Sequence, residues 1–86
     1  MEQILDVSGL EPPGPLEQSL SAVENLGPGD HLRILHRREP FPLYGILAAR
    51  GFAHRTLPGS QTAFEILVWR VGDAAAERAV GQDVER

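Results

Sequence analysis

The side chains best suited to metal binding, anion binding or catalysis in this chain belong to three histidines and to one arginine-rich segment. His31 and His36 lie five residues apart on one predicted strand, so their side chains point to opposite faces, and His54 falls on another predicted strand. A metal site would need His36 and His54 to meet across neighbouring strands. We favour histidines at strand ends without a metal, and we expect no resident cofactor.

The arginine-rich segment HRREPFPLY, residues 36–44, combines Arg37 and Arg38 with Glu39 and Tyr44. Pro42 suits the first turn of a helix, and two arginines beside a helix N-terminus offer a place for an anionic group. The interpretation that we favour is simpler, namely that Glu39 neutralises one arginine while the prolines shape the turn. Tyr44 has no evident catalytic partner in the sequence.

A second unusual segment is GLEPPGP, residues 9–15, with three prolines and two glycines in seven residues. Asp6 and Glu11 are the carboxylates near this turn, and nothing else in the sequence supports acid–base catalysis by them. The sequence contains no Ser-His-Asp spacing, no glycine-rich phosphate loop and no paired carboxylates on a helix. We therefore expect that the protein is not an enzyme.

Composition narrows the class of protein further. The chain has 86 residues, a net charge of −4 and no cysteine, so disulfides, thiolate nucleophiles and cysteine-based metal sites are excluded. An acidic chain has little attraction for nucleic acid or anionic lipid, and we expect neither as a partner. No apolar run approaches the roughly 20 residues of a membrane span, and the start MEQILDVSG lacks the basic region of a signal peptide. These features predict a soluble cytoplasmic protein.

Apolar spacing predicts the elements that must position these segments. Strands are expected over residues 4–7, 31–36, 52–57 and 63–71, with one helix after Pro15 and a second after Pro42. The order β-α-β-α-β-β predicts an α+β two-layer sandwich, in which a four-stranded mixed sheet carries both helices on one face. We assign residues 1–71 to this single domain and expect residues 72–86 to be a mostly disordered tail.

Strand alternation divides the predicted sheet into two faces. The helix-covered face is expected to hold Leu32, Ile34, Phe64, Ile66 and Val68, packed against Leu16, Leu20, Val23, Leu43 and Leu47. The opposite face receives Arg33, Leu35, Arg55, Glu65, Leu67 and Trp69. A tryptophan and two leucines on an uncovered face predict an apolar patch, suited to a partner or to a weak homodimer. The alternative is that Trp69 folds over its own sheet or is covered by the tail.

The segment LDVSGLEPPGP resembles the opening of the TusA/SirA-like sulfur carriers, whose first strand runs into Gly-Leu-x-Cys-Pro-x-Pro at the start of a helix. The segment LGPGDHLRIL resembles the following turn and second strand of that family. The resemblance covers about residues 4–71 and implies the same β-α-β-α-β-β fold. The residues that match the opening pattern are Leu5, Asp6, Gly9, Leu10, Pro13 and Pro15.

The reactive cysteine of the sulfur carriers is replaced in this chain by Pro12. In those carriers the thiolate is favoured by the N-terminus of a helix, and proline offers no nucleophile, so persulfide transfer by that mechanism is excluded. The chain is more similar to a cysteine-less branch, domain of unknown function 2249, in its GLEPP and REPFPLY segments. Many members of that branch have His-Asp-Pro-x-Pro-Leu, where this chain has Arg38 and Glu39 instead of the histidine and aspartate.

These observations favour a small non-catalytic adaptor that binds a protein partner. Because sulfur carriers present their first turn to partner proteins, the resemblance implies docking at the same turn here. The alternative is a ligand- or metal-binding domain, linked to redox or respiratory metabolism, that uses His36, His54 and the arginine cluster. The candidate partner-binding residues are Leu10, Glu11, Pro12, Pro13, Arg37, Arg38, Glu39 and Tyr44, with Leu35, Leu67 and Trp69 on the sheet face.

Overall fold

The computed structural model describes residues 1–84 and contains four strands and three helices. The predicted order β-α-β-α-β-β is confirmed, with one further helix at its end. The elements are β1 (Glu2–Asp6), α1 (Gly14–Glu24), β2 (His31–His36), α2 (Phe41–Ala49), β3 (Phe52–Pro58), β4 (Phe64–Arg70) and α3 (Ala74–Val84).

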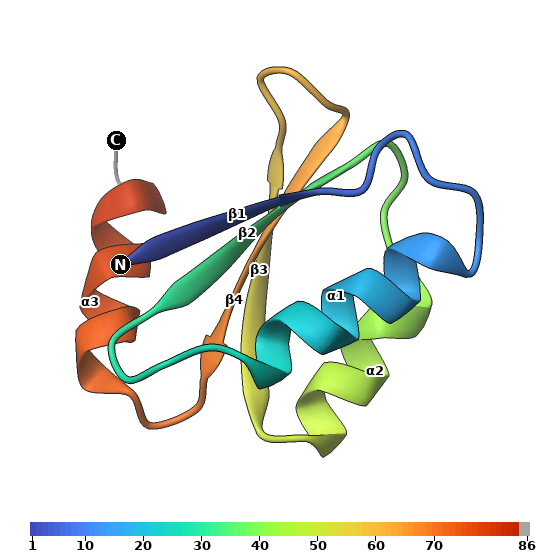
Figure 1. Ribbon diagram of the computed structural model, residues 1–86. Helices are drawn as coiled ribbons and strands as arrows, with labels where there is room; N and C mark the ends of the chain where they lie inside the picture. Colours follow the sequence, from blue (N-terminus) through green and yellow to red (C-terminus); the bar gives the residue numbers. More distant parts are fainter. Residues whose placement is uncertain (85–86) are drawn as a thin grey trace.

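The strands form the predicted four-stranded mixed sheet, and their order in it is β1-β2-β4-β3. β1 runs parallel to β2, because α1 carries the chain back across the sheet between them. β4 is antiparallel to both β2 and β3. Figure 1 shows α1 and α2 on one side of this sheet and α3 on the other.

The residues at the two ends of helices α1 and α2 explain where the helices begin and end. Pro15 and Pro42 lie in the first turns of α1 and α2, where the missing N–H of proline costs no helical hydrogen bond. Gly51 follows α2 with a positive φ of 84°, a conformation that a side chain disfavours. The chain thereby reverses directly from α2 into β3.

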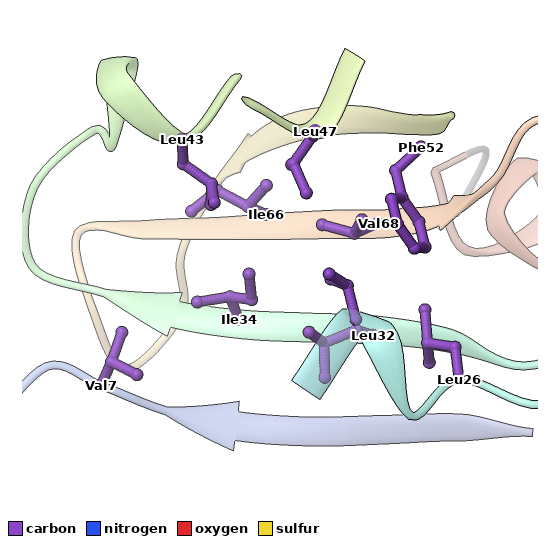
Figure 2. Packing of buried hydrophobic residues seen from close by; sticks show 10 residues of the cluster. Val7, Leu26, Leu32, Ile34, Leu43, Leu47, Phe52, Ile66 and Val68 are labelled. Atoms are coloured by element: carbon purple, nitrogen blue, oxygen red, sulfur yellow. The ribbon is translucent and has the colours of Figure 1, made fainter. Parts of the chain in front are cut away.

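The main core lies between the sheet and the pair α1 and α2 (Figure 2). The predicted helix-covered face is confirmed, since the expected strand and helix residues all belong to this cluster or pack against it. Each large side chain that is fully buried contributes about 1.5–3 kcal/mol relative to an exposed one. The core also contains three residues that the sequence patterns did not assign to it, namely Val7, Leu26 and Phe52.

The prediction of a disordered tail is wrong, because Ala74–Val84 form helix α3. Asp73 caps this helix, since its Oδ1 accepts the backbone N–H of Ala76 at 3.1 Å. Its Oδ2 accepts the N–H of Gly29 at 2.8 Å, which fixes the start of α3 to the turn before β2. The remaining residues of the predicted tail, 85–86, lie outside the described residues.

The prediction of an uncovered apolar patch is also wrong. Ala76 and Val80, four residues apart on α3, pack against Leu67 and Trp69 of β4. Leu67 is fully buried, Trp69 is 9% exposed, and Leu35 is half-buried. The sheet face on which a weak homodimer was expected is therefore occupied by the chain's own third helix, which corresponds to the alternative of cover by the tail.

The rest of this face carries both charged and apolar groups. The Arg33 guanidinium forms ion pairs with Glu2 and Glu65, which lie on the two strands beside it. Ile4 of β1, the register partner of Arg33, lies on the same face and is 64% exposed. Among the described residues, no helix has the length and apolar character that crossing a bilayer requires.

Candidate functional site

The two proline-rich segments lie together at one edge of the sheet. Residues 9–15 lead out of β1 and residues 37–44 lead out of β2, and both strands run in the same direction. Parallel strands bring their carboxyl ends to the same edge, where ligands commonly bind in α/β sheets. The backbone N–H of Val7 bonds to the carbonyl of Leu35 at 3.0 Å, so the two segments start side by side (Figure 1). We call these two segments the proline-rich end.

A cavity of about 340 Å³ lies between the two segments of the proline-rich end. Proline has a fixed φ and no N–H, so walls made of proline are stiff and offer few hydrogen-bond donors. Four of the residues that line the cavity are polar, namely Ser19, His36, Arg38 and Glu39. The apolar walls consist of Pro12, Pro13, Pro15, Pro40, Pro42, Leu16 and Leu43.

Ser19 is the most deeply placed polar residue of the cavity. It follows Pro15 and precedes Val23 by four residues each, so it shares the buried face of α1 and is only 1% exposed. Among the described residues, its Oγ has no hydrogen-bond partner. A buried hydroxyl in this state costs about 1–3 kcal/mol, and native structures rarely keep one without a partner such as water or a ligand.

His36, the last residue of β2, lies on the helix-covered face together with Ile34 and lines the cavity. Its Nδ1 accepts the backbone N–H of Arg38 at 3.1 Å. The neutral ring therefore carries its proton on Nε2, which is a donor. Burial, reinforced by the charges of Arg37 and Arg38, lowers the pKa of His36 below its ordinary value. The ring is accordingly neutral at pH 7.

The interpretation that Glu39 neutralises an arginine is wrong. The Glu39 carboxylate accepts a hydrogen bond from the Tyr44 hydroxyl at 3.2 Å, and within residues 1–84 neither Arg37 nor Arg38 forms an ion pair. Both arginines are exposed, and Arg38 lines the cavity. The positive charge at this end is therefore available to an incoming group.

Tyr44 belongs to a different cluster from the cavity. Its ring stacks on His54 with 4.0 Å between the ring centroids, and its hydroxyl lies 2.5 Å from Oγ1 of Thr56. Burial is the largest cause of the raised pKa of Tyr44. A tyrosine with a raised pKa is a weaker acid than usual. The Tyr44 hydroxyl therefore suits a structural hydrogen bond between α2 and β3.

His36 and His54 do not meet, contrary to what a metal site would require. β4 lies between their strands, and the register places His36 opposite Phe64 but His54 opposite Val68. Two strand spacings and four residues of rise separate them by roughly 16 Å. In the part of the chain that the structure describes, no group of three or more potential ligands is placed to hold a metal ion.

The structure distributes the other candidate residues over three places. Leu10 and Glu11 are exposed on the first segment of the proline-rich end, and Phe41 on the second segment is 67% exposed although the sequence patterns did not select it. Leu35, Leu67 and Trp69 lie on the far face of the sheet, away from the cavity. The candidate residues from the sequence that line the cavity are Pro12, Pro13, His36, Arg38 and Glu39.

Ser19 is the cavity residue that sequence reasoning missed. A serine among Glu17, Gln18 and Ser21 looks like part of the polar face of an amphipathic helix. The signal that could have found it is its spacing of four from both Pro15 and Val23, which places it on the apolar face.

Comparison with known proteins bears on the same stretch of chain. Neither the curated proteins nor the solved structures gave a match to this sequence. The model of one family matches residues 4–70, which run from β1 to the end of β4 and include the whole proline-rich end. The chain therefore belongs to the family described as uncharacterized conserved protein, DUF2249.

Proposed function

We propose that this chain is a small non-catalytic adaptor module that docks a protein partner at its proline-rich end. The observation that carries the proposal is the pairing of two stiff proline-rich segments, each of which presents an exposed apolar side chain. These side chains are Leu10, 39% exposed, on the first segment and Phe41 on the second. Aromatic residues are enriched at protein interfaces, and an exposed aliphatic side chain beside one adds apolar contact area.

The stiffness of the two segments favours this role. Binding costs less conformational entropy when the surface already has its bound shape, and five prolines hold this one. Glu11, Arg37 and Arg38 are exposed around it and supply charges that a partner can match. Docking at this end would leave the main core undisturbed, since the core lies beneath α1 and α2.

We further propose that the family is related to the TusA/SirA-like sulfur carriers and that docking persisted here after the cysteine was lost. The support is the shared β-α-β-α-β-β order and the position of Pro12, which occupies the place of the reactive cysteine in the resembling motif. The chain would then act in the cytoplasm as a carrier-like module without sulfur chemistry. Its lack of cysteine fits a reducing compartment, where disulfides contribute nothing.

Site-specific photocrosslinking in the source cell tests the docking surface. A photoreactive amino acid is placed at Phe41 in one variant and at Val71 in a control variant. Val71 is 65% exposed and follows β4, so it matches Phe41 in exposure but lies at another end of the sheet. We expect one discrete crosslinked protein with Phe41 and none with Val71.

The captured protein is then purified and its affinity for the adaptor is measured with wild type and with the variants Leu10→Asp and Val71→Asp. We expect Leu10→Asp to weaken binding at least tenfold, because a charge replaces an apolar anchor, and Val71→Asp to leave it unchanged. Equal affinity for all three proteins would show that docking takes place elsewhere.

A further inference from the structure

The two edges of the sheet differ in how well charge protects them. β1 and β3 are the outer strands, so each has one side without a neighbouring strand within residues 1–84. The carbonyl of Met1 and the N–H of Val7 bond to β2, and because bonding alternates along a strand, the backbone groups of Glu2, Ile4 and Asp6 face outward. Two of these three residues are carboxylates, and charged side chains commonly protect an exposed edge from pairing.

The edge of β3 lacks this protection. The N–H of Val71 bonds to the carbonyl of Gly51 at 3.0 Å where the chain enters β3, so every second residue from there bonds to β4. The backbone groups of His54 and Thr56 therefore face outward. Neither side chain carries a charge at pH 7, because burial lowers the pKa of His54. Arg55 is the charged residue of β3, and it lies on the opposite face of the sheet from these two side chains.

Helix α2 lies above the same edge and is apolar on all sides. The ring of Tyr44 stacks on His54, which places the helix over β3. The helical sequence FPLYGILAA contains no charged residue, whereas a surface helix normally has a polar outer face. The inner side of α2 belongs to the core, while Gly45 and Ala48 on its outer side are exposed. Helices that are apolar all round are normally buried, so this one is suited to a further contact.

A second copy of this chain fits this surface. The chain has a net charge of −4, and two copies repel each other least where neither carries charge. A two-fold axis perpendicular to the sheet, at His54 or at Thr56, brings two β3 strands together in antiparallel orientation. Arg55 then lies opposite Ala53 or Leu57 of the other copy instead of opposite a second arginine. The outward N–H and carbonyl groups of the two strands can pair in either register.

We propose that the chain forms a weak two-fold dimer, in which the β3 edges pair and join two four-stranded sheets into one. The axis keeps both α2 helices on the same side, so that their uncharged outer faces lie beside each other above the junction. The length of seven strand residues and the 18 Å depth of the molecule limit the contact to roughly 400 Å² on each copy. Stable interfaces bury about 800 Å² per copy, so the dimer forms reversibly and at high concentration.

Sedimentation velocity of the full-length chain from micromolar to millimolar concentration tests the proposal. We expect the mass to rise reversibly and to stop at that of a dimer, because each copy has a single β3 edge. The amide protons of His54 and Thr56 should exchange more slowly at the high concentration, while that of Ile4, on the other edge, should not change. A chain that stays monomeric at millimolar concentration, or a mass that rises beyond the dimer, would overturn the proposal.

A proline on each edge separates β3 from β1. His54→Pro deletes an outward N–H and no bond to β4, and proline is tolerated at such positions of edge strands. Ile4→Pro makes the same change on the β1 edge and is the matched control. We expect His54→Pro to weaken self-association about tenfold, since main-chain hydrogen bonds are lost, and Ile4→Pro to leave it unchanged. Self-association as strong in His54→Pro as in Ile4→Pro would place the contact elsewhere.

Ala48→Glu examines the helical part of the contact without altering a strand. Ala48 is exposed on α2, and the substitution places the carboxylates of the two copies near each other, so we expect the dimer to weaken about tenfold. Ser21→Glu adds the same charge at an exposed position of α1 and should leave the dimer intact. An unchanged dimer in Ala48→Glu would overturn the arrangement with α2 above the junction.

The dimer goes beyond the docking of a partner protein and is tested separately from it. Leu10→Asp removes an anchor proposed for the partner, on a segment that leads out of β1, and should leave self-association unchanged. Sedimentation uses the isolated protein, so a failure of the dimer leaves the crosslinking result standing, and the reverse also holds. Loss of the dimer in Leu10→Asp would place self-association at the proline-rich end and overturn the proposal.

Discussion

The two faces of the sheet bury polar atoms in different ways. On the face covered by α1 and α2, a cavity opens at the proline-rich end, and the hydroxyl of the lining residue Ser19 is buried without a hydrogen-bond partner among the described residues. On the face covered by α3, the ring nitrogens Nε1 of Trp69 and Nδ1 of His31 are buried and, within the described residues, also form no hydrogen bond. The cover differs, because prolines of two segments line an open cavity on the first face, while Ala76 and Val80 of α3 pack directly against the second. We call the face covered by α1 and α2, which has the cavity, the admitting face. We call the face covered by α3 the excluding face.

The largest effect is expected from breaking the excluding face. Val80 is 3% exposed between α3 and the sheet, and Val80→Asp places a charge in the apolar cluster that Val80 forms with Leu67 and Trp69. We expect a loss of about 2–4 kcal/mol in the free energy of unfolding, measured by urea denaturation. Trp69, the single tryptophan, should shift its fluorescence to the red as α3 detaches.

Ala74→Asp is the matched control for that prediction. Ala74 is exposed in the first turn of α3, where an added carboxylate interacts favourably with the helix dipole. Stability and fluorescence should therefore match those of the wild type. If Val80→Asp behaved like this control, α3 would not be the cover of Trp69 in solution.

A smaller effect is expected at the start of α3. Asp73→Ala removes both the cap on the N–H of Ala76 and the hydrogen bond to Gly29, so the amide protons of α3 should exchange faster with solvent. The variant Asp73→Asn keeps an acceptor oxygen at this position and should show intermediate protection. If the amide protons of α3 exchanged as slowly in Asp73→Ala as in the wild type, packing alone would hold the helix in place.

On the admitting face we expect a substitution that raises the free energy of unfolding instead of lowering it. Ser19→Ala removes a buried hydroxyl and introduces a better helix former, so the ligand-free protein should gain about 1 kcal/mol in the free energy of unfolding. The matched change at Ser21, which is exposed on the same helix, should gain only the few tenths that helix propensity provides. A net loss of stability in Ser19→Ala would show that the hydroxyl has a structural partner.

The smallest effect concerns the dependence of stability on pH. Burial and the two neighbouring arginines lower the pKa of His36 in the folded chain, so the unfolded chain binds a proton more readily. Stability from the neutral ring is present above the unfolded pKa of about 6.5 and is lost as the pH falls through the lower folded value. We expect the midpoint of thermal unfolding to fall less between pH 7 and pH 5 in His36→Gln than in wild type.

His54 needs a separate control in this experiment, because burial lowers its pKa as well. The variant His54→Gln measures how much of the pH dependence comes from His54. The variant with both substitutions should show the sum of the two single effects. Identical pH profiles for wild type and His36→Gln would contradict a buried neutral ring at the cavity.

The parts of the fold that alternation and helical spacing govern could be predicted from the sequence. Leu32 and Ile34 alternate with polar residues, and Leu43 and Leu47 recur one turn apart, so one face of each element was evident. α3 escaped prediction because its contact face consists of Ala76 and Val80, which provide little apolar signal in a segment of eleven residues. The error over Leu67 and Trp69 followed from it, since an uncovered face was assumed where a helix packs.

The cavity could be predicted only in part. Both proline-rich segments were predicted to be contact surfaces, the first because it resembles the turn that sulfur carriers present to their partners and the second as its neighbour. Their meeting depends on the parallel pairing of β1 with β2, and the depth of Ser19 depends on how α1 is rotated against the sheet. These are tertiary arrangements, and local residue patterns carry little information about them.

The position of α3 has a consequence for how such a domain can be labelled. Figure 1 places α3 on the side of the sheet away from α1 and α2. A fluorescent tag attached to α3 would therefore sit on the other side of the sheet from the cavity, so that it could report on binding experiments without covering the cavity.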